Sequence, residues 1–132
     1  MVEVKQYETK SGLSPFAEWF DLLNDDVTPR LVAAIRRMEL GNFGDVKPVG
    51  GGVSERRLDF GPGYRIYFGR DGADLVILLV GGTKKRQQRD IETAQDYWAD
   101  YKQRKREAAK AAKPKDEEQK PKKKKKKPKR GK

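Results

Sequence analysis

The apolar residues of this chain are confined almost entirely to its first 101 positions. Of 46 apolar side chains, 42 lie before position 102, and the remaining four are alanines. The charge divides at the same place, because residues 1–101 carry a net charge of −2 and residues 102–132 carry +13. Since burial of apolar surface drives folding, we expect one globular domain over residues 1–101 and a lysine-rich tail over residues 102–132.

The chain contains no cysteine and no histidine. This composition excludes disulfides and thiolate metal sites, and it removes the commonest zinc ligand and the commonest general base near neutral pH. We therefore expect no metal and no cofactor. No stretch approaches the roughly 20 apolar residues of a membrane span, and the first residues lack the basic-then-apolar order of a signal peptide. We expect no membrane contact and a cytoplasmic location.

Local signals in the first third of the chain predict a strand followed by a helical hairpin. Residues 2–7 begin with the alternation of apolar and polar side chains that is typical of a strand. Ser-Pro at 14–15 and Thr-Pro at 28–29 each mark the start of a short amphipathic helix. Gly-Asn at 41–42 provides the stop signal of the second helix.

A glycine-rich connection follows over residues 41–52. A phosphate-binding loop would need the order Gly-x4-Gly-Lys-Ser/Thr running into a helix, and this segment does not have it. The segment is therefore interpreted as a flexible connector.

Three strands and a helix are predicted next. Residues 53–60, 64–70 and 74–80 are separated by Gly-containing turns and indicate an antiparallel meander, whose third member is apolar on both faces and should be central. Apolar residues at helical spacing over residues 91–101 predict a last helix packed on the sheet. The fold class is therefore α+β, of order β-α-α-β-β-β-α, with an antiparallel sheet.

The first hairpin of this meander places charged side chains on one face. A three-residue loop over 61–63 keeps the apolar residues of both strands on the same side of the sheet. The other side then receives Asp59 across from Arg65 and Arg57 across from Tyr67. One interpretation is a solvated sheet face with an Asp59–Arg65 ion pair. The other is a phosphodiester site, because guanidinium groups make bidentate contacts with phosphate.

Four segments, taken in order, carry a resemblance to a known family over about residues 3–101. They are Ser11-Gly12-x-Ser14-Pro15-Phe16-x-Glu18-Trp19, Gly41-Asn42-Phe43-Gly44-Asp45-x-Lys47-Pro48-Val49-Gly50, Gly61-Pro62-Gly63-Tyr64-Arg65-Ile66-Tyr67-Phe68 and Gly81-Gly82-x-Lys84-x-x-Gln87-x-x-Asp90-Ile91. These segments resemble the HigB-like addiction module killer proteins of the RelE/ParE toxin superfamily.

The resemblance implies the toxin of a type II toxin–antitoxin system, with a cognate helix-turn-helix antitoxin as partner. RelE-like members cut messenger RNA on the ribosome, so it implies a metal-independent endoribonuclease that inhibits translation. ParE-like members instead inhibit DNA gyrase, and that alternative stays open, as does a non-catalytic nucleic-acid-binding protein.

Residue by residue, the resemblance implies catalytic roles for Arg57, Arg65, Tyr67 and Lys84. Lys84 and Tyr67 are candidates for proton transfer or positioning, and the arginines would hold and neutralise the phosphate. RNA-binding residues are expected at Lys47, Lys85, Arg86, Lys122, Lys123, Lys124, Lys125, Lys126 and Lys127.

Two positions depart from the family pattern. Between Glu55 and Arg57 the family usually has leucine, whereas this chain has Arg56. The predicted hairpin register directs the Arg56 side chain toward the core side of the sheet. The acid that usually follows the Gly-Gly pair is Thr83, and Lys85 and Arg86 come soon after it, which makes this corner more basic.

The tail has no counterpart in the family pattern. Its first part has strong helix formers but no apolar face, so we expect helix to about residue 113 and disorder beyond it. Lysine runs without aromatic residues attract phosphate without reading sequence, which favours non-specific contact with ribosomal RNA. A solubilising extension without a role, or a localisation signal, are the alternatives.

Overall fold

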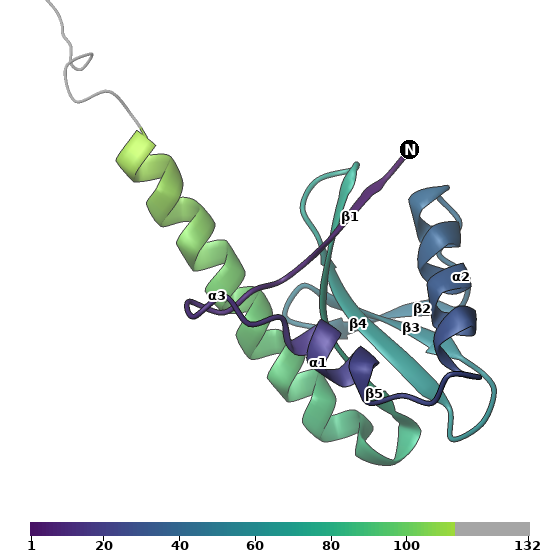
Figure 1. Ribbon diagram of the computed structural model, residues 1–132. Coiled ribbons are helices and arrows are strands. Elements are labelled where there is room, and N and C mark those ends of the chain that lie inside the picture. Colours follow the sequence, from purple (N-terminus) through teal and green to yellow (C-terminus); the bar gives the residue numbers. More distant parts are fainter. Residues whose placement is uncertain (113–132) are drawn as a thin grey trace, which may run out of the picture. The chain divides into compact units, whose positions relative to one another are not determined.

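Helix and strand boundaries follow these local signals over residues 1–112, which are the residues that this computed structural model describes (Figure 1). The elements are β1 (Glu3–Gln6), α1 (Pro15–Asp21), α2 (Thr28–Glu39), β2 (Val46–Gly50), β3 (Val53–Leu58), β4 (Tyr64–Arg70), β5 (Leu75–Thr83), a 3-10 turn (Lys84–Arg86) and α3 (Gln87–Ala112). The expected α+β class is confirmed, with one strand more than the sequence predicted. Residues 1–101 form one compact unit.

Helix α1 begins as the sequence predicts. The side-chain oxygen of Ser14 accepts a hydrogen bond from the backbone N–H of Ala17 at 3.1 Å, and Pro15 occupies the first turn, where its missing N–H costs nothing. Helix α2 also has its proline in the first turn, although no side chain caps it. Both helices bury an apolar stripe against the sheet, which fixes their orientation.

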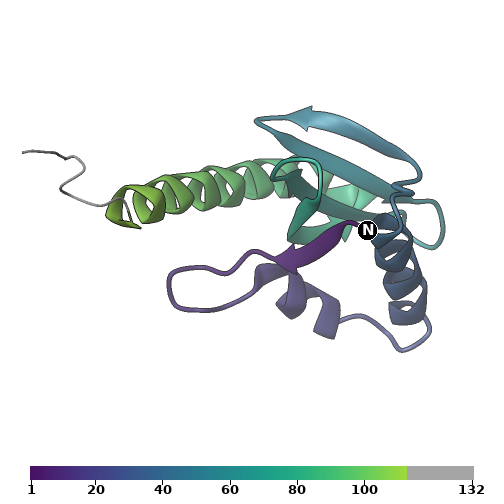
Figure 2. The same cartoon turned by 90° about the horizontal axis from the view of Figure 1, so that it is seen from above.

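The sheet is mixed, and not antiparallel throughout as the sequence predicted, with strand order β1-β5-β4-β3-β2. Strand β1 runs parallel to β5, with Val4 opposite Val76, and the other neighbouring pairs are antiparallel. The β2–β3 hairpin therefore lies at the opposite edge from β1 (Figure 2). As expected, the apolar segment 74–80 forms a central strand.

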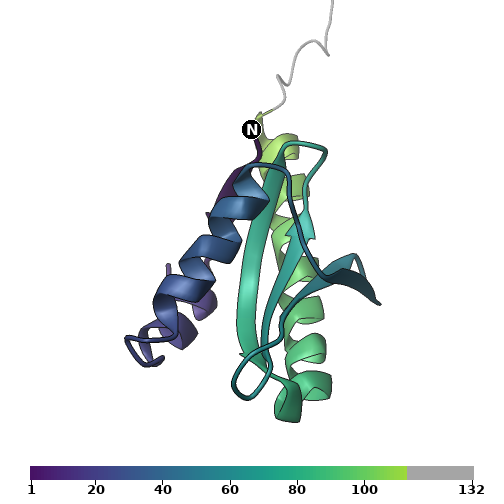
Figure 3. The same ribbon diagram turned by 90° about the vertical axis from the view of Figure 1, so that its right-hand side faces the viewer.

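The two faces of the sheet bury separate apolar cores, so that the structure has three layers (Figure 3). Val76 and Leu78 of β5 point toward the α1–α2 hairpin, whereas Ile77 and Leu79 point toward α3. All four side chains are buried. A central strand with helices on both faces must be apolar on both faces, which explains the unbroken apolar run in β5.

The glycine-rich connection is not the flexible linker that the sequence indicated. It contains β2, an edge strand with a neighbour on one side only. Proline is tolerated at Pro48 because a residue of an edge strand does not need to donate a backbone N–H to a second neighbour. Gly50, Gly51 and Gly52 form the tight turn into β3 with φ of 97°, 63° and 84°. A Cβ on Gly52 would lie 2.6 Å from Nε1 of Trp98, so the absence of a side chain at this position allows Trp98 of α3 to pack against the turn.

The β3–β4 pairing differs from the predicted register by two residues. The loop spans residues 59–63, and Arg57 lies opposite Arg65 while Glu55 lies opposite Tyr67. The expected Asp59–Arg65 pairing is therefore wrong. Because side chains alternate with a period of two, a shift of two residues keeps every side chain on its predicted face and changes only its partners.

Candidate active site

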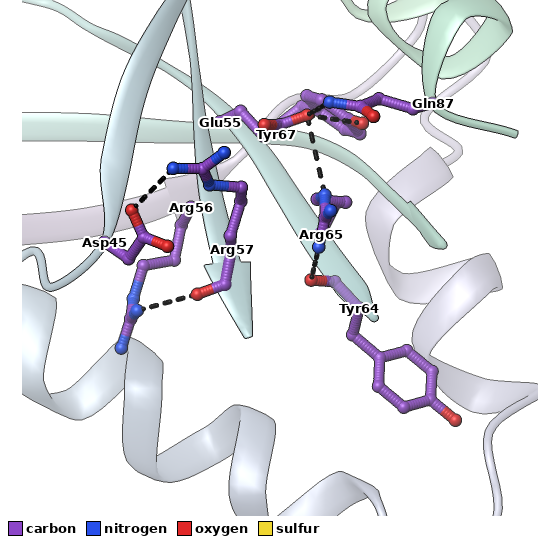
Figure 4. A network of polar contacts seen from close by, with 8 residues as sticks. All are labelled: Asp45, Glu55, Arg56, Arg57, Tyr64, Arg65, Tyr67 and Gln87. Carbon is purple, nitrogen blue, oxygen red and sulfur yellow. Dashed lines mark hydrogen bonds and ion pairs between the residues drawn. The ribbon is translucent and has the colours of Figure 1, made fainter. Parts of the chain in front are cut away.

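A buried carboxylate lies at the centre of the charged face of the sheet. Glu55 is 0% exposed, and its Oε2 accepts hydrogen bonds from the hydroxyl of Tyr67 at 3.1 Å and from Nε2 of Gln87 at 2.7 Å. Nε of Arg65 lies 3.7 Å from the same oxygen (Figure 4). A buried charge needs such partners, and two strands and the start of α3 supply them.

Tyr67 remains a neutral phenol at physiological pH. Its side chain is fully buried, and burial, followed by the charge and hydrogen bond of Glu55, raises the pKa of Tyr67 well above its ordinary value. The phenol therefore donates its proton to a hydrogen bond and is not a base. In this arrangement Tyr67 holds Glu55 and has no exposed surface with which to contact a substrate.

Arg65 is also nearly buried, with 7% of its surface exposed. One of its terminal nitrogens donates to the backbone oxygen of Tyr64 at 3.2 Å. A Cβ added to Gly63 would lie 3.5 Å from that guanidinium and 3.3 Å from Cβ of Lys84. Arg65 and the stem of Lys84 therefore flank the same glycine, which brings two of the expected catalytic residues together.

Arg57 points to the other side of this cluster, toward the start of β2. Its terminal nitrogen donates to Oδ1 of Asp45 at 2.9 Å (Figure 4). The hydrogen bond and charge of Arg57 lower the pKa of Asp45, and the same contact raises the pKa of Arg57. The four expected catalytic residues are thus divided: Arg65 and Tyr67 share Glu55, Lys84 lies beside Arg65, and Arg57 is engaged by Asp45.

An open groove runs between β2 and the start of α3. It is lined by Lys47, Lys84, Lys85 and Gln87, with apolar contacts from neighbouring side chains. We call these four residues the lysine groove. Gln87 connects it to the buried cluster, because its amide donates to Glu55. Lys47 is therefore brought beside Lys84 and Lys85, from a distant part of the chain, and the three expected cations line one surface above a buried carboxylate.

The remaining expected RNA-binding residues lie elsewhere. Arg86 is exposed within the turn of residues 84–86 but does not line the lysine groove. The lysines at 122–127 lie outside the described residues.

Sequence reasoning did not assign roles to Glu55, Gln87 or Asp90. Gln87 and Asp90 stand in the fourth segment of the family resemblance, which was the available signal. Burial raises the pKa of the Asp90 carboxyl, and a Cβ on Gly82 would collide with its Oδ2. Gly82 pairs with Arg65 across the sheet, so the glycine gives Asp90 room next to the site.

Within residues 1–112, no three His, Cys, Asp or Glu side chains gather closely enough to hold a metal ion. None of the helices described is both long enough and apolar enough to span a bilayer.

Comparison with known proteins identifies the family. The model of the family described as phage derived protein Gp49-like (DUF891) matches residues 18–99. The chain belongs to this Gp49-like family, which is a RelE/ParE-like toxin family of addiction modules. A Haemophilus influenzae protein described as "Uncharacterized protein" is 44% identical over 80 residues, which cover 60% of this chain and 81% of the relative.

Proposed function

We propose that this toxin-family protein is a ribosome-dependent, metal-independent endoribonuclease of the HigB-like kind, with a helix-turn-helix antitoxin as its partner. The observation that carries the proposal is the lysine groove, in which Lys47, Lys84 and Lys85 face solvent above the buried Glu55 cluster. Such a groove suits a phosphodiester backbone, because ammonium groups attract phosphate and leave the bases unread.

The reaction proposed is attack of a ribose 2′-oxygen on the adjacent phosphorus. A bond forms between the 2′-oxygen and phosphorus, the bond from phosphorus to the 5′-oxygen breaks, and a proton leaves the 2′-hydroxyl while another reaches the 5′-oxygen. The products are a 2′,3′-cyclic phosphate and a 5′-hydroxyl. Negative charge accumulates on the phosphate oxygens during this step, and fixed cations stabilise it.

Lys84 is the expected catalytic residue best supported for contact with that phosphate. It is exposed, it lines the lysine groove and it stands beside Arg65 at Gly63. Arg65 adds positive charge from below the surface. Glu55 and Tyr67 are then positioning residues, since Glu55 fixes Arg65 and Gln87, and Tyr67 fixes Glu55.

The test is in vitro translation of a defined messenger RNA with primer extension to map cleavage. Wild type should give new 5′ ends only when ribosomes are translating. Lys84→Ala should lower the cleavage rate by ~10²-fold or more, as removal of one preorganised charge-stabilising group does elsewhere. Lys10→Ala, which removes an exposed lysine that does not line the groove, is the matched control.

A gyrase supercoiling assay run in parallel distinguishes the ParE-like alternative. Inhibition of gyrase without any new messenger RNA ends would refute the nuclease proposal. Equal cleavage by Lys84→Ala and Lys10→Ala would refute the role of the lysine groove in the reaction.

A further inference from the structure

A second basic groove lies between α2 and β3, apart from the lysine groove. Four guanidinium groups line it, from Arg30 and Arg37 of α2 and from Arg56 and Arg57 of β3. We call it the arginine groove. Asp45 and Asp59 also line it, so the cations exceed the anions by two. The proposed cleavage chemistry uses none of the first three arginines.

The fold holds these arginines in place. Arg30 and Arg37 are seven residues apart and therefore lie on the same side of α2. The guanidinium of Arg30 lies 3.7 Å from the centre of the Phe60 ring. A planar guanidinium stacked on a ring keeps its edge N–H groups available for an anion.

Arg56 is the most constrained member of the groove. It faces the same side of the sheet as Ile66, as the sequence predicted, and it donates from a terminal nitrogen to the backbone oxygen of Arg57 at 2.9 Å. Its Nε is buried and has no hydrogen-bond partner. The Arg56 guanidinium lies against Gly44. A Cβ at Gly44 would come within 2.5 Å of that guanidinium, so the lack of a side chain there leaves space for Arg56.

The charges in the groove are incompletely balanced. Burial and the nearby charge of Arg37 lower the pKa of Arg56, so the two cations repel each other. Asp45 is engaged by Arg57 through a hydrogen bond of 2.9 Å. An incoming anion between Arg37 and Arg56 would relieve the repulsion between the two guanidinium groups.

We propose that the arginine groove binds the sugar–phosphate backbone of single-stranded RNA at positions outside the cleaved bond. The identity of the ligand rests on the proposed function, whereas the groove itself does not. RNA fits better than an acidic protein segment because Arg57 connects the groove to the candidate active site, pairing across the sheet with Arg65. Neighbouring β-strands are about 4.8 Å apart, so a single RNA chain can contact the arginine groove at Arg57 and the candidate active site at Arg65.

Position 56, which supplies one of the four guanidinium groups, departs from the family pattern. The family pattern recognised in the sequence has leucine there, which would leave only three of the guanidinium groups. The departure in sequence therefore adds a guanidinium to this groove, where the Nε atoms of both Arg56 and Arg57 are buried without a hydrogen-bond partner.

Binding is tested with the full chain, a fluorescein-labelled single-stranded RNA and no ribosomes, by fluorescence anisotropy over a range of salt. Arg37→Ala should weaken binding about fivefold and lower the magnitude of the slope of log K against log salt by about 0.7, as expected for one lost phosphate contact to a single strand. Arg36→Ala is the matched control, since Arg36 is its neighbour on α2 but donates to Glu39 at 3.0 Å and does not line the groove. Equal effects of the two substitutions would overturn the proposal.

Chemical protection locates the contact independently of the tail. Phenylglyoxal modification followed by mass spectrometry should show that RNA protects Arg30 and Arg37 and leaves Arg36 reactive. Reactivity of Arg30 and Arg37 unchanged by RNA would overturn the proposal, and so would protection by poly-glutamate as effective as that by RNA, which would mark a protein-docking surface.

The two proposals fail separately. A protein that binds RNA through Arg37 but gives no cleavage on translating ribosomes refutes the nuclease proposal alone. A protein that cleaves messenger RNA but whose Arg37→Ala and Arg36→Ala variants bind RNA equally refutes the arginine groove alone.

Discussion

Nε of Arg65 lies 3.7 Å from Oε2 of Glu55, and the two side chains are 9% and 0% exposed. Because of this contact, a substitution at the candidate active site can lower folding stability as well as activity. One interpretation of the sequence is a solvated sheet face, and a charge on such a face can be removed at little cost to stability. A charge that compensates a buried carboxylate cannot be removed in this way.

We therefore predict that Arg65→Ala lowers the free energy of unfolding by about 3–5 kcal/mol, because it leaves Glu55 buried without its cation. Asp45→Asn weakens the Arg57–Asp45 pair, whose side chains are 34% and 57% exposed, and should change the free energy of unfolding only slightly because water screens the pair. Urea denaturation measures both. Similar small effects would mean that Glu55 does not depend on Arg65. Loss of growth arrest in Arg65→Ala can result from unfolding as well as from a missing charge at the site, so the urea measurement accompanies any toxicity assay of this variant.

The core beneath the helical hairpin gives a second prediction. Ile66 is 0% exposed, so Ile66→Ala should leave a cavity and lower the free energy of unfolding by about 2–5 kcal/mol. Val32→Ala, at a side chain that is 54% exposed on α2, is the control and should have a small effect. Thermal melts compare the two. A neutral Ile66→Ala would show that the face assignment of β4 is wrong.

A third prediction concerns alkaline pH. Burial, with a hydrogen bond of 2.7 Å from the Tyr101 hydroxyl to Asp71, raises the pKa of Tyr101 from 10.0 to about 12. The unfolded chain then loses this proton before the folded chain does, so the contribution of Tyr101 to stability is present below pH 10 and is lost as the pH rises toward 12.

Tyr101→Phe removes this dependence. At pH 8 it should lower the free energy of unfolding by about 0.5–1.5 kcal/mol through the lost hydrogen bond. The difference from wild type should shrink as the pH is raised to 11, because only wild type is penalised by ionisation of Tyr101. Urea denaturation over this pH range checks it, and a difference that stays constant would contradict the assignment.

The tail gives a fourth prediction. Residues 113–132 include the six lysines at 122–127 and no side chains suited to a core. Deleting them should leave the melting temperature nearly unchanged and weaken the association with ribosomes, with a flatter dependence on salt. Ribosome co-sedimentation against salt compares the two forms. Superimposable curves would mean that the tail makes no electrostatic contribution to binding.

Elements with local signals were predictable from the sequence. Ser14 and Pro15 specify the start of α1 through groups within three residues of each other. The apolar run of β5 identifies a central strand because both of its faces must be covered. Strand β2 was missed, since Pro48 and its flanking glycines disfavour a strand, and only pairing with β3 at a sheet edge stabilises one there.

The candidate site was predictable only in part. Alternation along β3 and β4 placed Arg57, Arg65 and Tyr67 on one face correctly, because that pattern has a period of two. It could not choose between registers that differ by two residues, since both give the same faces. The length of the loop decides between them, and Gly61 and Gly63, with φ of 55° and 79°, allow the five-residue loop that is found.

The sequence by itself thus determined the fold class, the extent of the apolar part of the chain and the face on which the charged residues gather. These depend on composition and on side-chain spacing within single elements. Only the tertiary structure decided that Glu55 is buried, because its partners Tyr67 and Gln87 lie 12 and 32 residues away along the chain. A carboxylate is hydrated by default, and it becomes the centre of a site only where folding removes its water and supplies such donors instead.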